Sequence, residues 1–209
     1  VMKAMWSSKE NIAILLEIYR QSCLLPMEYV DAIKNSITLF RRLLLGSKKD
    51  PIPKLVSESE NLLSMQQFFI EQLPNVFITE TKPQTAEQQV TLCLEIFQMF
   101  KQTFERNEAL PTEIRDVLLF TLLEVSKTLL KPDNPNQDLA KSLASVTVDT
   151  LLFTWITSKI MDTEMWARLQ EGIQLLFHRI EPITQSKLKL VQMSLIIRDF
   201  IYPPVQKKK

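Results

Sequence analysis

The sequence contains only two glycines and one histidine among 209 residues. Glycine supplies phosphate-cradling loops, left-handed turns and β-bulges, so its scarcity argues against a nucleotide-binding α/β fold and against a β-sandwich. One histidine and two distant cysteines, Cys23 and Cys93, make a poor ligand set for a tetrahedral metal site. Both cysteines lie in apolar runs, which favours buried, reduced thiols over a disulfide framework.

A surplus of charge of one sign and long apolar runs are also missing. The formal net charge is +1, without the surplus of lysine and arginine that a generic nucleic-acid binder needs. Charged residues interrupt every stretch before it reaches the ~20 apolar residues of a membrane span. Neither a signal-peptide pattern nor an N-x-S/T acceptor is present. We therefore expect a cytoplasmic protein with no transmembrane segment and no nucleic-acid partner.

Apolar residues recur at helical spacing in eight segments, and no segment shows sustained strand alternation. Ser7 and Glu10 have the spacing of a capping box, as do Thr85 and Gln88, and Asp162 or Thr163 is expected to cap a later helix. The stretches 46–57 and 131–137 are predicted loops. The predicted helices run from Ser7 to the break at Pro26, from there to Gly46, and over about 58–73, 85–104, 111–130, 138–161, 163–181 and 184–202.

Pairing these helices gives units that start near residues 8, 58, 112 and 163, a period on the order of fifty residues, slightly longer than HEAT and armadillo repeats. The fourth helix carries two apolar stripes, as a helix between two neighbours in a stack requires. One stripe holds Val90, Leu94, Phe97 and Phe104, and the other holds Leu92, Ile96 and Met99. We predict an all-α fold, an α-solenoid of stacked antiparallel pairs over 1–209 as a single domain, rather than a closed four-helix bundle.

No catalytic constellation is recognisable. His178 stands between Phe177 and Arg179 with no nucleophile and acid pair nearby, so we interpret it as a structural histidine. Glu58, Glu60 and Glu71 are interpreted as solvated surface. Phosphate-loop, dinucleotide and zinc-protease motifs are absent. We predict no catalytic, cofactor-binding or metal-binding residue and no cofactor.

Two basic clusters are candidates for contact with acidic lipid or an acidic protein face, and the alternatives are an exposed loop and a solubilising tail. They comprise Arg41, Arg42, Lys48, Lys49 and Lys54 around the loop 46–57, and Lys207, Lys208 and Lys209 at the end.

Three tryptophans are candidate anchors. Trp155 and Trp166 are expected in the core where consecutive helices meet, whereas Trp6 could instead lie at an interface.

Three segments carry a family resemblance. They are SSKENIAILLEIYRQSCLLP (7–26), DVLLFTLLEVSKTLLK (116–131) and LAKSLASVTVDTLLFTWITSKIMDTEMWARL (139–169). In order and spacing they resemble the N-terminal helical region of the α subunits of Ral GTPase-activating protein complexes, over about 7–202. The β subunits and tuberin are similar more faintly. The segments 46–57 and 74–84 are shorter than expected for an α subunit.

The resemblance implies a non-catalytic helical scaffold, part of a larger protein, that assembles with another subunit of a GTPase-activating complex. In that family a separate C-terminal domain supplies a catalytic Asn, so no catalytic residue is carried over to this chain. A Ral-, Rap- or Rheb-type GTPase would be engaged through the parent protein. The alternatives are a stand-alone HEAT- or armadillo-type adaptor and, with less support, a helical enzyme using a bound cofactor. A longer reading frame distinguishes the first two.

Overall fold

The computed structural model describes residues 8–45, 59–79, 82–106, 110–160 and 162–176, together with 183–184, 187–188, 190–192 and 194–195. Within the described residues up to 176 the chain forms eight α-helices and two short 3₁₀ helices, the described residues from 183 to 195 are also helical, and none of the described residues is in a strand, which confirms the all-α prediction. The elements are α2 (Lys9–Cys23), η1 (Met27–Tyr29), α3 (Val30–Leu45), α5 (Ser59–Gln72), α6 (Pro74–Ile78), η2 (Pro83–Thr85), α7 (Ala86–Arg106), α8 (Thr112–Leu130), α9 (Gln137–Thr157) and α10 (Thr163–Leu176).

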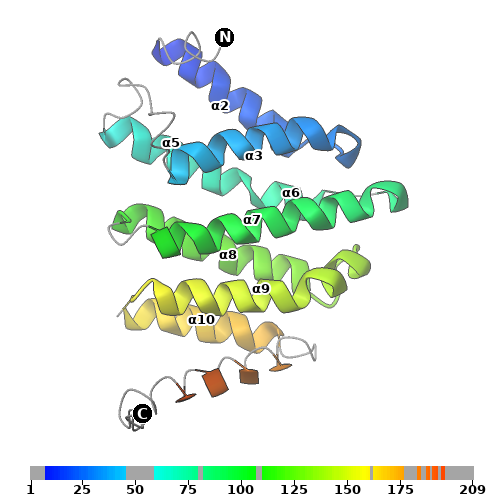
Figure 1. Cartoon of the computed structure of the whole chain (residues 1–209), viewed down its shortest axis with the longest axis vertical. Coiled ribbons are helices and arrows are strands. Elements are labelled where there is room, and N and C mark those ends of the chain that lie inside the picture. Colours follow the sequence, from blue (N-terminus) through cyan, green and yellow to red (C-terminus); the bar gives the residue numbers. More distant parts are fainter. Residues whose placement is uncertain are drawn as a thin grey trace, which may run out of the picture.

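The helices succeed one another along the long axis, from α2 at one end of Figure 1 to α10 near the other. One row contains α3, α7 and α9, since α3 contacts α7 and α7 contacts α9. A second row contains α2, α5 with α6, α8 and α10, each of which contacts the next. Contacts of α2 with α3, α6 with α7 and α8 with α9 join the rows. The first helices of successive pairs begin at residues 9, 59, 112 and 163, close to the predicted unit starts.

Local signals set most helix ends, with two corrections. The first cap is Ser8 rather than Ser7, because the Ser8 hydroxyl accepts a hydrogen bond from the Asn11 N–H at 3.2 Å. Thr85 is not a cap for Gln88; it lies in η2, and its hydroxyl donates to the Lys82 carbonyl. Asp162 does cap α10, since its carboxylate accepts from the Glu164 N–H at 2.8 Å.

The break expected at Pro74 begins a further short helix, α6, with Pro74 at its first position. Proline is tolerated there because the first turn has no intrahelical partner for its missing N–H.

Two buried glutamines satisfy carbonyl groups at the ends of neighbouring helices. The Gln66 amide donates to the Leu43 carbonyl in the last turn of α3 at 3.0 Å. The Gln89 amide donates to the Val76 and Thr79 carbonyls at the end of α6, at 3.0 and 3.1 Å. Helix C-termini leave carbonyls without intrahelical partners, so these amides replace the water that burial excludes.

Gly172 marks a close approach between α10 and α8. A Cβ at this position would lie 2.5 Å from Cδ1 of Leu123, a buried side chain of α8. Contacts this short require the neighbour to move, so the absence of a side chain at Gly172 permits the two helices to pack at this spacing.

Helix α9 is the one described helix that is long and apolar enough, by length and composition, to cross a membrane. Its most apolar window has a mean hydropathy of 1.2, and 56 % of that window is buried, as expected of a core helix between α7 and α8. The buried hydroxyls of Thr147 and Thr154 donate to backbone carbonyls one turn earlier, at 2.8 and 2.9 Å. Burial in the core is therefore sufficient to explain its apolar composition.

The two tryptophans expected in the core, Trp155 and Trp166, differ in burial. Trp155 on α9 is fully buried, which confirms the prediction, and its indole N–H has no hydrogen-bond partner among the described residues. Trp166 is 42 % exposed, so the core assignment is wrong for this residue. Its indole N–H donates instead to the Ile160 carbonyl at 2.9 Å, which ties α10 to the segment before it. Helical spacing alone could not distinguish the two positions, because burial depends on which neighbours cover each face.

Lys159, just after α9, has a left-handed backbone conformation with φ of 53°. An L-residue with a side chain is disfavoured there by roughly 1 kcal/mol, whereas glycine is not. We expect Lys159→Gly to stabilise the protein by about 0.5 kcal/mol after the entropy of the unfolded glycine is subtracted. Lys159→Ala, which retains the Cβ, should give no such gain in a urea denaturation series.

Candidate interaction surfaces

Polar side chains cross-link the row α3, α7 and α9 on its surface. Lys34 of α3 pairs with Glu95 of α7 at 2.7 Å, and the Arg41 guanidinium donates to the Gln102 amide oxygen at 2.6 Å. Lys101 of α7 pairs with Asp149 of α9. Ion pairs near the surface contribute about 0–1 kcal/mol each. They therefore fix the relative positions of the helices more than they stabilise the fold.

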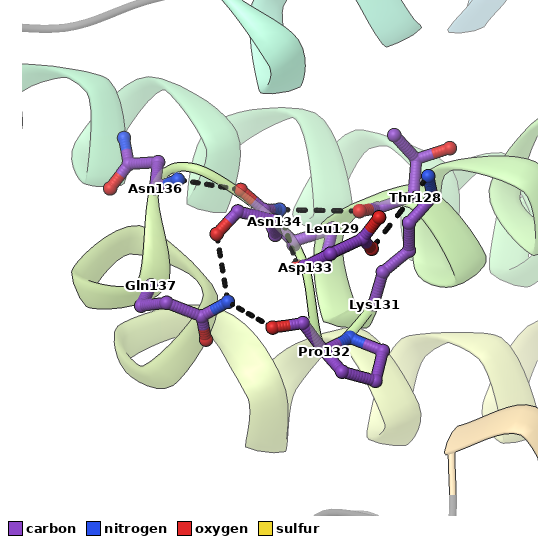
Figure 2. Close-up of polar contacts among 8 residues, drawn as sticks. All are labelled: Thr128, Leu129, Lys131, Pro132, Asp133, Asn134, Asn136 and Gln137. Carbon is purple, nitrogen blue, oxygen red and sulfur yellow. Dashed lines mark hydrogen bonds and ion pairs between the residues drawn. The ribbon is translucent and has the colours of Figure 1, made fainter.

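The loop between α8 and α9 is organised by Asn134 (Figure 2). Its side-chain N–H₂ donates to the carbonyls of Thr128 and Leu129 at the end of α8, at 3.2 and 2.7 Å. Its side-chain oxygen accepts from the Asn136 N–H at 2.7 Å. One side chain therefore closes α8 and fixes the residue that caps α9.

The loop's remaining side chains complete the turn. The Asn136 oxygen accepts from the Leu139 N–H at 3.0 Å and caps α9. The Gln137 amide donates to the carbonyls of Pro132 and Asn134 at 2.8 and 2.7 Å, as Figure 2 shows. The side-chain amides of Asn134, Asn136 and Gln137 therefore all form hydrogen bonds with backbone groups of this loop and the adjoining helix ends.

Substitutions in this loop can distinguish the hydrogen bonds of Asn134 from the effect of the nearby charges of Lys131 and Asp133. Asn134→Ala leaves the carbonyls at the end of α8 without their side-chain donor, and we expect a loss of about 1–3 kcal/mol in unfolding free energy. Asn134→Asp lacks the donor as well and should not rescue stability. Asp133→Ala is the matched control, because the Asp133 side chain is 79 % exposed and lies 3.9 Å from Lys131. A loss as large for Asp133→Ala as for Asn134→Ala would contradict the assignment.

A groove of about 520 Å³ lies between this loop and the end of α6. Phe77, Ile78 and Thr79 contribute one wall, and Thr128, Lys131 and residues 133–136 contribute the other. Ile78 is 56 % exposed, so the groove presents an apolar side chain beside a polar rim. Such a lining suits a protein segment, and none of its side chains is a histidine or cysteine that could act as general base or thiol nucleophile.

Helix α2 has a second exposed apolar surface. Ile14 and Ile18 are one helical turn apart and are 56 and 51 % exposed. Their helix contacts α3 and α5 through its other residues, including the buried Leu15 and Tyr19. The α2 surface is therefore available to a further protein element.

Among the described residues, those singled out in the sequence do not assemble into a reactive site. Cys23 and Cys93 are buried, and burial raises the pKa of the Cys23 thiol to about 11 and that of Cys93 further still. Both thiols are therefore protonated and unreactive at neutral pH. Within the described residues no group of three or more histidine, cysteine or acidic side chains could hold a metal ion.

Several sequence predictions fall outside the described residues. His178, Trp6, Gly46 and Glu58 are among them, as are Lys48, Lys49, Lys54 and Lys207–Lys209. Lipid contact by these lysines stays a prediction. Of the basic cluster, Arg41 is occupied in the contact between α3 and α7. The contributions of Gln66, Gln89 and Asn134 were not foreseen, because polar residues inside a helix or loop carry no sequence signal of the distant carbonyls they meet.

The described part of the chain is an all-helical region that exposes apolar side chains on α2 and beside a groove at the end of α6. The family model described as the RALGAPB N-terminal domain matches residues 85–203, more than half of the chain, and the chain belongs to that family. The model represents the β subunit, whereas the sequence landmarks pointed first to the α subunit. The subunit type therefore stays a prediction.

Curated relatives agree with this family. The chain is 26 % identical to the Ral GTPase-activating protein subunit beta of Rattus norvegicus over 160 residues, covering 75 % of this chain and 10 % of the relative. The Mus musculus subunit is 25 % identical with the same coverage. The probable Rho GTPase-activating protein CG5521 of Drosophila melanogaster is 21 % identical over 265 residues, covering 97 % of this chain and 14 % of the relative.

The chain thus spans about a tenth to a seventh of the length of these relatives. The alignment with the fly protein is longer than this chain, so that protein has additional segments within the matched region. No solved structure matches.

Proposed function

We propose that this chain is a non-catalytic helical scaffold within a small-GTPase-activating protein complex, where it joins subunits and positions a catalytic domain located elsewhere. The observation that carries this proposal is the family match over residues 85–203, which relates the chain to the N-terminal part of a Ral GTPase-activating subunit. The match favours a role in GTPase regulation over a stand-alone adaptor unrelated to it. The proposal includes a cytoplasmic location and a Ral-, Rap- or Rheb-type GTPase reached through the parent protein.

The scaffold is proposed to be an α-solenoid, a single domain of HEAT- or armadillo-like pairs. Support comes from the two rows of helices, in which each first helix contacts the next first helix and each second helix contacts the next second helix. In such a stack every unit buries its faces against its neighbours, and the result is an elongated surface suited to binding other proteins. The open groove at Ile78 and the α2 surface at Ile14 and Ile18 are candidate contact areas on it.

The non-catalytic part of the proposal has its own support. Accelerating GTP hydrolysis requires a side chain, an asparagine or an arginine finger, held rigidly beside the γ-phosphate. The amide of Asn134 is occupied by backbone groups of its own turn, and the Asn136 oxygen caps α9. The Arg41 guanidinium donates to Gln102. These side chains support helix ends and helix contacts rather than a nucleotide.

Two measurements on the purified chain test the proposal. Mixed at micromolar concentration with GTP-loaded Ral, Rap or Rheb-type GTPases, it should leave the intrinsic hydrolysis rate unchanged, with a catalytically competent activator as the positive control. A reproducible acceleration of roughly tenfold would overturn the non-catalytic assignment. In the second measurement, the chain should co-purify with another subunit of the complex. Failure to bind any subunit, with a folded chain, would contradict the scaffold role.

A further inference from the structure

Helix α10 leaves one apolar face open beside α9. Its packing against α8 uses Gly172, and the Arg168 guanidinium lies 4.9 Å from the centre of the Phe120 ring. On another face, a groove of about 690 Å³ is lined by Leu152 of α9 and by side chains of α10 that include Trp166 and Ile173. The hydrogen bond from the Trp166 indole N–H to the Ile160 carbonyl fixes the orientation of the ring, so this ring forms a rigid apolar wall of the groove.

The order of contacts predicts what this groove should receive. The second helix of each pair contacts the second helix of the preceding pair, as α7 contacts α3 and α9 contacts α7. Helix α10 is the first helix of a fourth pair, because it follows α8 in its row. The second helix of that pair would lie against α9 and α10, which are the two helices that line the groove.

A matching apolar stripe lies further along the same chain. Leu188, Val191 and Leu195 are helical residues spaced three and four positions apart, so they share one helix face. They are 50, 50 and 43 % exposed, although buried apolar side chains of this size contribute ~1.5–3 kcal/mol each. Gln192 and Ser194, beside them in sequence, are also exposed and polar. An apolar stripe and an apolar groove are therefore both exposed in one molecule.

We propose that the stripe of Leu188, Val191 and Leu195 binds the groove formed by Leu152, Trp166 and Ile173, which makes the helix that carries these three residues the second helix of the fourth pair. The short sequence distance between Leu176 and Ile183 favours this occupant, since a short tether gives an effective concentration in the millimolar range that a separate partner rarely reaches. The closed state covers Trp166. The proposal concerns folding of this chain and does not depend on the function proposed above.

Disulfide trapping in the full chain tests the proposal. Ile173→Cys combined with Val191→Cys should form an intramolecular disulfide under mild oxidation, because the bond requires Cα atoms within about 7 Å. Ile173→Cys with Gln192→Cys is the matched control, since position 192 is about 100° further round the helix, and it should cross-link poorly. The native cysteines are buried, and the raised pKa of Cys23, about 11, keeps it from competing.

Each outcome decides the proposal. Efficient trapping of the 173–191 pair alone supports it, and equal trapping or no trapping of the two pairs overturns it. Dimers linked through the 173–191 pair at low protein concentration would show that a second copy occupies the groove, which also overturns it. As a separate readout in a Trp6→Phe background, Val191→Asp should increase iodide quenching of Trp166, because Trp155 is fully buried. Unchanged quenching with an unchanged circular dichroism spectrum would likewise contradict closure.

Discussion

Trp155→Ala should lower the free energy of unfolding by ~3–5 kcal/mol, the usual result of deleting a buried large aromatic side chain. Trp155 is fully buried on α9, a helix that packs against both α7 and α8, so the cavity would open inside the core. Surrounding side chains in a close-packed core relax only partly into such a space. Urea denaturation followed by far-UV circular dichroism measures the loss.

Two further variants make this test specific. Trp155→Phe retains most of the ring volume and removes an indole N–H that finds no partner in the part of the chain that the structure describes, so its loss should be well below that of Trp155→Ala. Ile156→Ala changes a neighbour that is 38 % exposed and should cost less than about 1 kcal/mol. An unfolding midpoint unchanged by Trp155→Ala would place the residue on the surface and contradict the core described here.

Phe69→Ala should have a loss of similar size, also ~3–5 kcal/mol, but located at the other end of the helix stack. The Phe69 ring packs edge-on against Tyr19 of α2, with ring centres 4.3 Å apart, and lies 5.2 Å from the Phe40 ring of α3. Its carbonyl also accepts a long hydrogen bond, 3.4 Å, from the Tyr19 hydroxyl. Because each aromatic pair adds about 0.5–1.5 kcal/mol beyond burial, one substitution weakens the junction of three helices.

The location of the effect is the sharper part of this prediction. Helices α2 and α3 contact mainly their near neighbours, so Phe69→Ala should speed amide hydrogen exchange in α2, α3 and α5 while α8 and α9 stay protected. Phe68→Ala is the matched control, since Phe68 is only partly buried and its ring lies 6.3 Å from that of Phe69. Uniform loss of protection along the whole chain would show that the helices unfold as one cooperative unit instead.

Helix existence and order were predictable because their signals are local. Pro26 ends the first helical segment, as its ring disfavours a helical residue before it, and the structure has α2 ending at Cys23. Pro111 precedes α8 as expected, and Asp162 caps α10. The predicted end of the sixth helix at 161 was too late, since α9 ends at Thr157. The turn that follows contains the left-handed Lys159, for which the sequence offers no glycine as a signal.

The candidate contact surfaces were less predictable. Apolar periodicity assigns Leu94, Ile156 and Trp166 to core stripes, yet all three are more than a third exposed. Conversely, Gln66 and Gln89 are polar and buried, because each meets carbonyls at the end of another helix. Burial follows from the position of neighbouring helices, and a stripe of side chains shows only that some partner is expected, not whether one is present.

The sequence by itself determined that the described part of this protein is all-helical, where most of its helices begin, and the spacing of the predicted units, because capping, proline and apolar period act over a few residues. Its landmarks also identified the family. Only the tertiary structure decided which apolar faces are covered, that Gly172 permits the close approach of α10 to α8, and that Asn134 closes the turn between α8 and α9. The physical reason is that hydrogen bonds and close packing between helices join residues far apart in sequence. Local sequence patterns do not predict which distant residues will be the partners.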